Sequence, residues 1–250
     1  MNYIDSWCHR WQLSVNIKKS LILHLGKSNS HFQYHFSNSL LPSPVSTIDL
    51  GVLIHQSLSF SSHISSIVAK ARARCAIFLK RFVSRDPKLM TKFFISYVRP
   101  LLEFSSPVWS PISSFEINLL EGVQRYFTSR IRDCTGLPYH VRLSLLSLHS
   151  LYHRRLVTDI LTLHSHLTAN AAPPLLPHLS FFPPSIARGH NLKLFLPITH
   201  YKSHAQNFLS RLSSTWNSLP LSLFVSSQLS TRHNLSNYLS DPFFPPHVPP

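Results

Sequence analysis

The chain has 250 residues, and its 44% hydrophobic content predicts one or two globular domains rather than a disordered protein. Its 24 lysines and arginines stand against only 9 aspartates and glutamates, which gives a formal net charge of +15. This excess favours a polyanionic partner; the alternative is a reading frame whose composition has drifted basic.

The three cysteines, Cys8, Cys75 and Cys134, are far apart and odd in number. They therefore predict neither a disulfide framework nor a paired metal knuckle, and we expect an intracellular setting, nuclear or cytoplasmic. The N-terminus lacks the basic and apolar regions of a signal peptide. No run of about 18 uncharged apolar residues indicates a membrane span, so no membrane partner is expected.

The first sixty residues predict one helix and a small sheet. Trp7, Trp11 and Val15 recur at helical spacing within residues 2–16. Three short segments follow with the apolar or alternating pattern of strands, which predicts a small antiparallel sheet. They are residues 21–25, 32–36 and 48–54.

Helices are predicted from about residue 61 onward. Apolar side chains at a 3.6-residue period predict a long helix to about residue 82, with Ile67, Ala71, Phe78 and Phe82 in the core. Further helices are expected at about 113–132, 139–148 and 151–168.

A second helix is predicted between these, beginning at an aspartate followed by a proline. Asp86 is expected to be its N-cap and Pro87 its first residue. Pro100 predicts its end near Val98. The core side chains expected from this segment are Phe93, Tyr97 and Leu101.

Five prolines at 173, 174, 177, 183 and 184 predict an extended linker. Beyond it we expect a strand at 192–197 and helices at about 203–217 and 228–239. The expected anchors of this part are Phe208, Leu212, Trp216 and Leu219. The predicted fold class is therefore α+β, mostly α, with a small antiparallel sheet at the N-terminus, a helical bundle and a small C-terminal α/β element.

The sequence predicts no complete catalytic or metal site. The nine acids are scattered, whereas phosphoryl transfer with two metal ions needs clustered carboxylates. His31 and His35 share a face in a strand, but no cysteine or carboxylate completes a zinc ligand set. The five scattered glycines cannot form a phosphate-binding loop.

Basic residues in the middle of the chain are the stronger signal. Lys70, Arg74 and Arg81 fall on one flank of the predicted helix, where they could follow a nucleic-acid backbone and neutralise its phosphates. The alternative is an ordinary solvated helix face. Nine basic residues and one acid, Asp86, lie in this stretch: Lys70, Arg72, Arg74, Lys80, Arg81, Arg85, Lys88, Lys92 and Arg99.

Several sequence blocks, taken in order, resemble the region that follows the catalytic palm strand in LINE-type (non-LTR) retrotransposon reverse transcriptases. The first block is Trp7-x3-Trp11-x-Leu13-x2-Asn16-x2-Lys19-Ser20. The middle region, Leu50 to Arg155, includes Pro107-Val108-Trp109-Ser110-Pro111 and Val123-Gln124-Arg125-Tyr126-Phe127-Thr128. The last block is Trp216-Asn217-x-Leu219-Pro220.

This resemblance implies a role for several residues. Lys19 matches a lysine that lies near the phosphates of the incoming nucleotide, and Leu50, Gly51 and Val52 match the hairpin that grips the primer end. The helices between residues 61 and 103 match the thumb, which closes on the template–primer duplex. Trp109 and Trp216 are expected to be core anchors rather than base-stacking platforms.

The resemblance also implies a division of the chain. Residues 1–56 are expected to be a remnant of the palm with a hairpin like the primer grip, and residues 57–170 a thumb-like helical domain. A proline-rich linker at 171–185, a small domain at 186–240 and a disordered tail at 241–250 would follow.

The family's Tyr-x-Asp-Asp motif and its earlier palm aspartate have no counterpart here. We therefore expect a truncated RNA-directed DNA polymerase that is inactive alone and keeps a surface for an RNA–DNA or DNA duplex. No cofactor or small-molecule substrate is expected, and Mg²⁺ would belong only to the full-length parent enzyme. The alternative is a non-enzymatic interaction protein built on the helical region.

Overall fold

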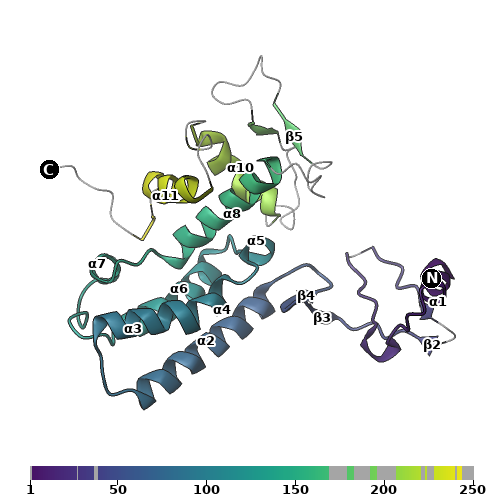
Figure 1. The fold of residues 1–250 in the computed structure, drawn as a ribbon, viewed down its shortest axis with the longest axis horizontal. Helices are drawn as coiled ribbons and strands as arrows, with labels where there is room; N and C mark the ends of the chain where they lie inside the picture. Colours follow the sequence, from purple (N-terminus) through teal and green to yellow (C-terminus); the bar gives the residue numbers. More distant parts are fainter. Residues whose placement is uncertain are drawn as a thin grey trace. The chain divides into compact units, whose positions relative to one another are not determined.

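The computed structural model describes residues 2–26, 28–36, 39–168, 179–182, 192–195, 207–220, 223, 228–239 and 241–243 (Figure 1). The chain divides into two compact units, residues 1–63 and 64–250. The predicted α+β, mostly α class is confirmed, because helices predominate in the described ranges and the strands there form two-stranded antiparallel sheets.

The first unit begins with helix α1 (Asn2–Arg10) and a short 3-10 helix, η1 (Ile17–Lys19). Its strands form two hairpins, β1 (His35–Phe36) with β2 (Ser39–Leu40) and β3 (Ser46–Asp49) with β4 (Val52–His55). The predicted helix over 2–16 is therefore too long. It ends at Arg10, and the chain turns at Gln12, which has a φ of 54°.

The expected sheet of three strands is also wrong. Residues 21–25 lie outside the strands, although the Ile22 amide donates to the Pro42 carbonyl at 2.9 Å. Pro42 and Pro44 have no N–H with which to extend that pairing. Residues 48–54 make two strands rather than one, since Leu50 and Gly51 form a turn with φ values of 44° and 87°. Positive φ at both central positions fits a tight hairpin.

The second unit contains most of the helices. The predictions at 61–82, 113–132, 139–148 and 151–168 are confirmed as helices with small changes in their ends. The helices are α2 (Ser61–Arg81), α3 (Pro87–Phe93), α4 (Arg99–Glu103), α5 (Ser106–Trp109), α6 (Ser114–Thr128), α7 (Tyr139–Leu145) and α8 (Leu151–Thr168). The predicted cap of α3 is confirmed too, because Asp86 Oδ2 accepts the Leu89 amide at 3.0 Å.

The helix that begins at Pro87 does not stop before Pro100. A π turn, η2 (Phe94–Val98), joins α3 to α4, so the helical path continues to Glu103. In a regular α-helix the proline ring would collide with the carbonyl four residues earlier. The wider π turn, in which the Arg99 amide bonds to the Phe94 carbonyl, accommodates Pro100 at the start of α4.

The π turn also changes which side chains face the core. Residues four apart drift by about 40° per step around a regular α-helix, and a π turn takes up part of that drift. As a result Met90, Phe94, Val98 and Leu102 are all fully buried. The prediction that Tyr97 is in the core is wrong, because its side chain is 59% exposed.

The other predicted core positions had mixed outcomes. Ile67, Ala71 and Phe78 are buried, as predicted. Phe93 and Leu101 are half-buried. Phe82 is 48% exposed, because α2 ends one residue before it and the chain leaves the helical face.

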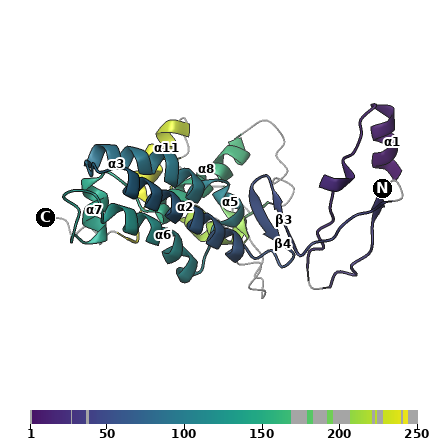
Figure 2. The ribbon, with the colours of Figure 1, turned by 90° about the horizontal axis from the view of Figure 1, so that it is seen from below.

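The C-terminal elements are β5 (Ser180–Phe181), β6 (Leu194–Phe195), α10 (Phe208–Ser218) and α11 (Gln228–Tyr238). Helices α10 and α11 lie beside α8 (Figures 1 and 2). The predicted anchors are confirmed: Leu212, Trp216 and Leu219 are buried and Phe208 packs against them. They share this core with Ile160 and Leu163 of α8, so the C-terminal elements complete a core that includes the long helix.

The predicted linker at 171–185 lies outside the described residues except for 179–182, where β5 pairs with β6. Within the predicted tail, residues 241–243 are described and are not free of the helical unit. Asp241 Oδ1 accepts the Ser150 hydroxyl at 2.7 Å, and Asp241 Oδ2 accepts the Ser150 amide at 2.9 Å. This carboxylate therefore satisfies two donors at the start of α8.

Candidate nucleic-acid interface

Helix α2 has one apolar face and one basic face. Its sequence contains neither glycine nor proline and includes exposed alanines, which favours an unbroken helix. The buried side chains of the apolar face are Ile64, Ile67, Val68, Ala71, Cys75 and Phe78. The exposed basic side chains are Lys70, Arg72, Arg74, Lys80 and Arg81.

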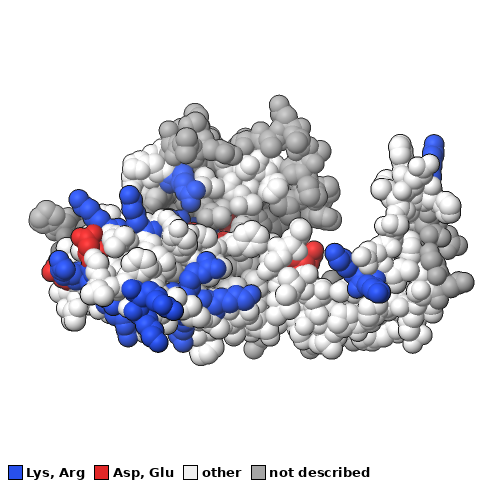
Figure 3. All heavy atoms as spheres, turned by 60° about the horizontal axis from the view of Figure 1, so that its bottom comes forward, with Lys and Arg blue, Asp and Glu red and all other residues white. Residues whose placement is uncertain are grey.

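Lys and Arg side chains gather on the face that comes forward in Figure 3, the side of the helical unit on which α2 lies in Figure 1. The three predicted residues, Lys70, Arg74 and Arg81, are all exposed. At 1.5 Å per residue, Lys70 and Arg81 are about 16 Å apart along the helix, the axial length of about five phosphates on one strand. Sequence reasoning did not assign a role to Arg72 and Lys80, although their basic side chains on α2 were visible.

Arg74 is tied to the neighbouring helix. Its Nη1 donates to the backbone carbonyl of Tyr97 at 2.7 Å, which joins α2 to the π turn. Arg72 instead lies toward α6, where its Nη2 is 3.6 Å from the position that a Cβ would take at Gly122. One side chain of the basic face, Arg74, is thus held by a hydrogen bond to the neighbouring helical segment.

A row of aromatic rings fixes α2 against α3 and η2. Phe78 stacks on Phe82 at 4.3 Å and on Phe93 at 3.4 Å between ring centroids. Phe93 in turn stacks on Tyr97 at 5.4 Å. Stacked rings resist sliding of one helix along another, because the offset geometry is lost with a small shift. These stacked rings therefore fix the position of α2, which carries the basic face.

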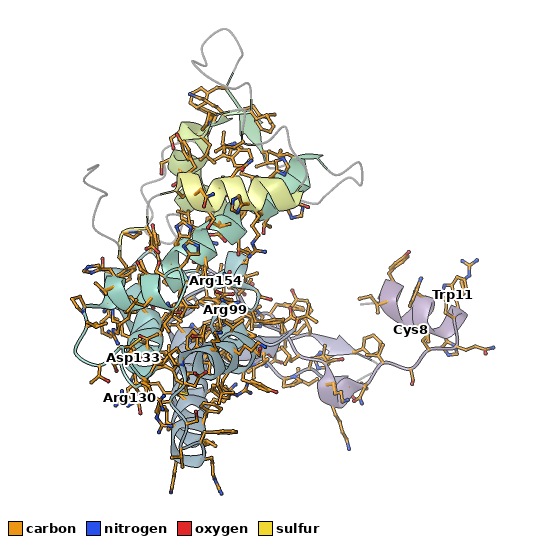
Figure 4. All side chains as sticks on the ribbon, turned by 60° about the vertical axis from the view of Figure 1, so that its left-hand side comes forward. Cys8, Trp11, Arg99, Arg130, Asp133 and Arg154 are labelled. Carbon is orange, nitrogen blue, oxygen red and sulfur yellow. The ribbon has the colours of Figure 1, made fainter. Side chains whose placement is uncertain are left out.

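Helix α4 is joined to α8 by charged side chains. Glu103 Oε2 accepts from Arg154 Nη2 at 3.1 Å and lies 3.8 Å from Arg99 Nε. Arg99 and Arg154 lie close together where these helices meet (Figure 4). Burial, and then the positive charge of Arg154, lower the pKa of Arg99, and Glu103 opposes that effect. The carboxylate of Glu103 therefore offsets the repulsion between the positive charges of Arg99 and Arg154.

A buried acid, Glu121 of α6, positions the start of α8. It accepts the hydroxyl of Tyr139 and the amide of Leu151. Burial raises the pKa of Glu121, while the Tyr139 hydrogen bond and the charge of buried Arg155 oppose the rise. Sequence reasoning missed this group, because no spacing rule identifies a carboxylate that caps a helix 30 residues later. Its partners are the amides of Leu151 and Tyr152 and the hydroxyl of Tyr139, so it joins α6 to α7 and α8.

The remaining predicted site residues belong to the first unit. Lys19 is exposed at the end of η1 rather than at the start of a strand. Leu50 and Gly51 form the exposed turn between β3 and β4, with Leu50 88% exposed, whereas Val52 is buried. A second contact holds the hairpin, since the Leu53 amide donates to Nδ1 of buried His63 at 3.2 Å. The hairpin implied by the resemblance is thus present, and its contact with a primer remains a prediction.

No family model matches the chain. No solved structure matches it either. Over 123 residues the chain is 28% identical to the uncharacterized protein B0403.1 of Caenorhabditis elegans. That match covers 48% of this chain and 62% of the worm protein, so it spans less than two thirds of the relative.

The described residues include potential metal ligands, but these do not cluster. Among them, no group of three or more His, Cys, Asp or Glu side chains could hold a metal ion. His31 lies outside the strands, and the centroid of its ring is 4.8 Å from that of His24, with the two rings tilted by 57°. In the described ranges, no helix combines the length and apolar character needed to cross a bilayer. The basic side chains of α2 therefore remain the candidate site among the described residues.

Proposed function

We propose that this chain is the C-terminal part of a LINE-type (non-LTR) retrotransposon reverse transcriptase, a truncated RNA-directed DNA polymerase without catalysis of its own. Its helical unit would hold template–primer nucleic acid along α2. The observation that carries the proposal is the exposure of Lys70, Arg74 and Arg81 on one face of a single well-packed helix. The ordered sequence blocks described above support the assignment to this class.

The physical basis for binding is the release of counterions. Each phosphate that a lysine or arginine neutralises frees part of the condensed ion atmosphere, and this favours association at low salt. The basic face supplies such charges at positions set by the helix. An intracellular setting, nuclear or cytoplasmic, agrees with the cysteines, since Cys8, Cys75 and Cys134 are all free and buried.

The test is the salt dependence of binding to an RNA–DNA duplex. For the wild-type chain, we expect log affinity to fall with log salt by several units, at about 0.9 per phosphate contacted. Changing Lys70, Arg74 and Arg81 together to alanine should flatten the slope by about two to three units. The matched control is Arg10→Ala, Lys18→Ala and Arg132→Ala, which removes the same charge from exposed positions outside α2.

An equal loss of slope in both triple variants would mean that net charge, and not the α2 face, governs binding. The non-enzymatic alternative has its own observation in the second unit. Phe104, Val108 and Phe115 are exposed apolar side chains, with Phe115 75% exposed. A chain that binds no duplex with a salt-dependent affinity would favour an interaction protein over a nucleic-acid binder.

A further inference from the structure

Tyr97 is the outer end of a row of four aromatic rings. The row runs from Phe82 through Phe78 and Phe93 to Tyr97, with interplanar angles of 23°, 15° and 19° between successive rings. Phe78, in the middle, is buried, whereas Tyr97 is 59% exposed. The exposed ring of Tyr97 is therefore nearly parallel to rings that are packed in the interior.

The exposed ring has one free face of fixed orientation. Phe93 covers the other face at 5.4 Å between centroids, in an offset stack. The tyrosine lies in the π turn, which brings its side chain out of the core while its neighbours Phe94 and Val98 stay buried. Isolated π turns within α-helices are found often at functional sites, because they re-aim single side chains.

A cation is bound to the backbone of this tyrosine. Arg74 Nη1 donates to the carbonyl of Tyr97 itself at 2.7 Å, so the guanidinium is held next to the tyrosine. A guanidinium has five N–H donors, and this hydrogen bond uses one of them. An oriented aromatic face and an adjacent cation are the two groups that single-stranded nucleic acid requires, one for a base and one for its phosphate.

Phe82, at the other end of the row, is a useful contrast. It is also exposed, and one of the cations near it in the sequence, Arg85, is bonded to the protein. Arg85 donates to the carbonyls of Leu79, Phe82 and Ser84 and so closes the C-terminus of α2.

We propose that an unpaired nucleobase of the bound nucleic acid stacks on the exposed face of Tyr97, with the adjoining phosphate on Arg74. This inference rests on the proposed function and narrows its ligand to nucleic acid with a single-stranded part. An apolar protein partner fits less well, because its contact would place Arg74 and the other α2 cations against an uncharged surface.

The experiment compares two ligands and four forms of the full chain. The ligands are a fluorescent oligothymidylate and an abasic strand with the same number of phosphates, at one fixed salt concentration. The wild type should bind the base-bearing strand more tightly by roughly 5- to 150-fold, the range for stacking one base. Tyr97→Leu should abolish that preference and leave the affinity for the abasic strand unchanged.

Two further variants serve as controls. Tyr97→Phe keeps the ring and should keep the preference, and Phe115→Leu removes a remote exposed ring and should also keep it. Equal affinity of the wild type for both strands would overturn the proposal, and so would an undiminished preference in Tyr97→Leu. If duplex and abasic strand still bind with a steep salt slope, only this inference fails. If neither binds with such a slope, the proposed function fails with it.

Discussion

The carboxylate of Glu121 in α6 caps the backbone of Leu151 at the start of α8, with each carboxylate oxygen 3.1 Å from the amide nitrogen. The same group lies near Arg155, whose side chain is almost completely buried. One acid therefore satisfies a helix terminus and compensates a buried cation. Removing Glu121 would therefore leave the Leu151 amide without its acceptor and buried Arg155 without this compensating charge.

Replacement of Glu121 should destabilise the protein more than an ordinary surface change. Glu121→Ala removes the carboxylate whose charge most favours buried Arg155, and the expected loss is about 3 kcal/mol or more. Glu121→Gln keeps one acceptor and should cost about 1–3 kcal/mol. Urea denaturation gives both values. Asp133→Asn is the matched control, because it removes an exposed carboxylate at a left-handed position that asparagine tolerates. A cost as large in the control would contradict the cap.

His153 should contribute to the pH dependence of the free energy of unfolding. Burial lowers the pKa of this side chain from 6.5, whereas the charge of Asp241 opposes the shift. A histidine whose pKa is lowered on folding contributes stability above pH 6.5, and that part is lost as the pH falls through the folded pKa. We expect the free energy of unfolding of His153→Gln to fall less between pH 6.5 and 5 than that of the wild type. Parallel curves for the two proteins would show that His153 titrates alike in both states.

Trp216→Ala should cost about 3 kcal/mol or more. The indole is fully buried, and its Nε1 donates to the Leu192 carbonyl at 2.8 Å. Thermal or urea unfolding measures the change. Trp11→Ala, which removes an indole that is 61% exposed, should stay within about 1 kcal/mol. Similar losses for the two tryptophans would mean that the cluster around Trp216 contributes little.

Limited proteolysis should cut within residues 170–185, the proline-rich segment, and leave residues 45–168 intact. The shared core adds a second expectation. Because Leu212 and Trp216 pack with Ile160 and Leu163, the cut pieces should co-elute on gel filtration without denaturant. The same cut in Trp216→Ala should release the smaller piece. First cuts within 61–103 would contradict the helical unit as the stable part.

The purified chain should incorporate no nucleotide on a primed RNA template with magnesium or manganese. Two-metal phosphoryl transfer needs clustered carboxylates, and the scattered acids of this sequence supply none. Template-dependent primer extension above a buffer blank would overturn the interpretation of the chain as a truncated polymerase. A full-length reverse transcriptase run in parallel establishes that the template and primer are competent.

Helix positions could be predicted well because the signals are local. Asp86 and Pro87 mark the start of α3 by a cap and a fixed φ, and the apolar spacing of Ile67, Ala71 and Phe78 defines the inner face of α2. These patterns act within a few residues, so sequence alone is sufficient.

The predictions that failed depend on backbone geometry and helix contacts that the spacing of nearby apolar residues does not determine. Assigning Tyr97 to the core assumed an unbroken α-helix, and the π turn before Pro100 moved the buried face by one residue. The flank of Lys70, Arg74 and Arg81 was predictable from helical spacing. The bond from Arg74 to Tyr97, by contrast, joins residues 23 apart and depends on how two helices meet.

The hydrogen bonds between Ser150 and Asp241 span 91 residues, and this separation has a consequence for the newly made chain. A ribosome adds about 5–20 residues per second, so the start of α8 waits roughly 5–18 s for its carboxylate. During the first part of that interval Ile160 and Leu163 are also without the leucines and tryptophan of α10 that later cover them. The long helix therefore leaves the ribosome with Ile160 and Leu163 uncovered, and its surroundings are complete only after both α10 and Asp241 have been made.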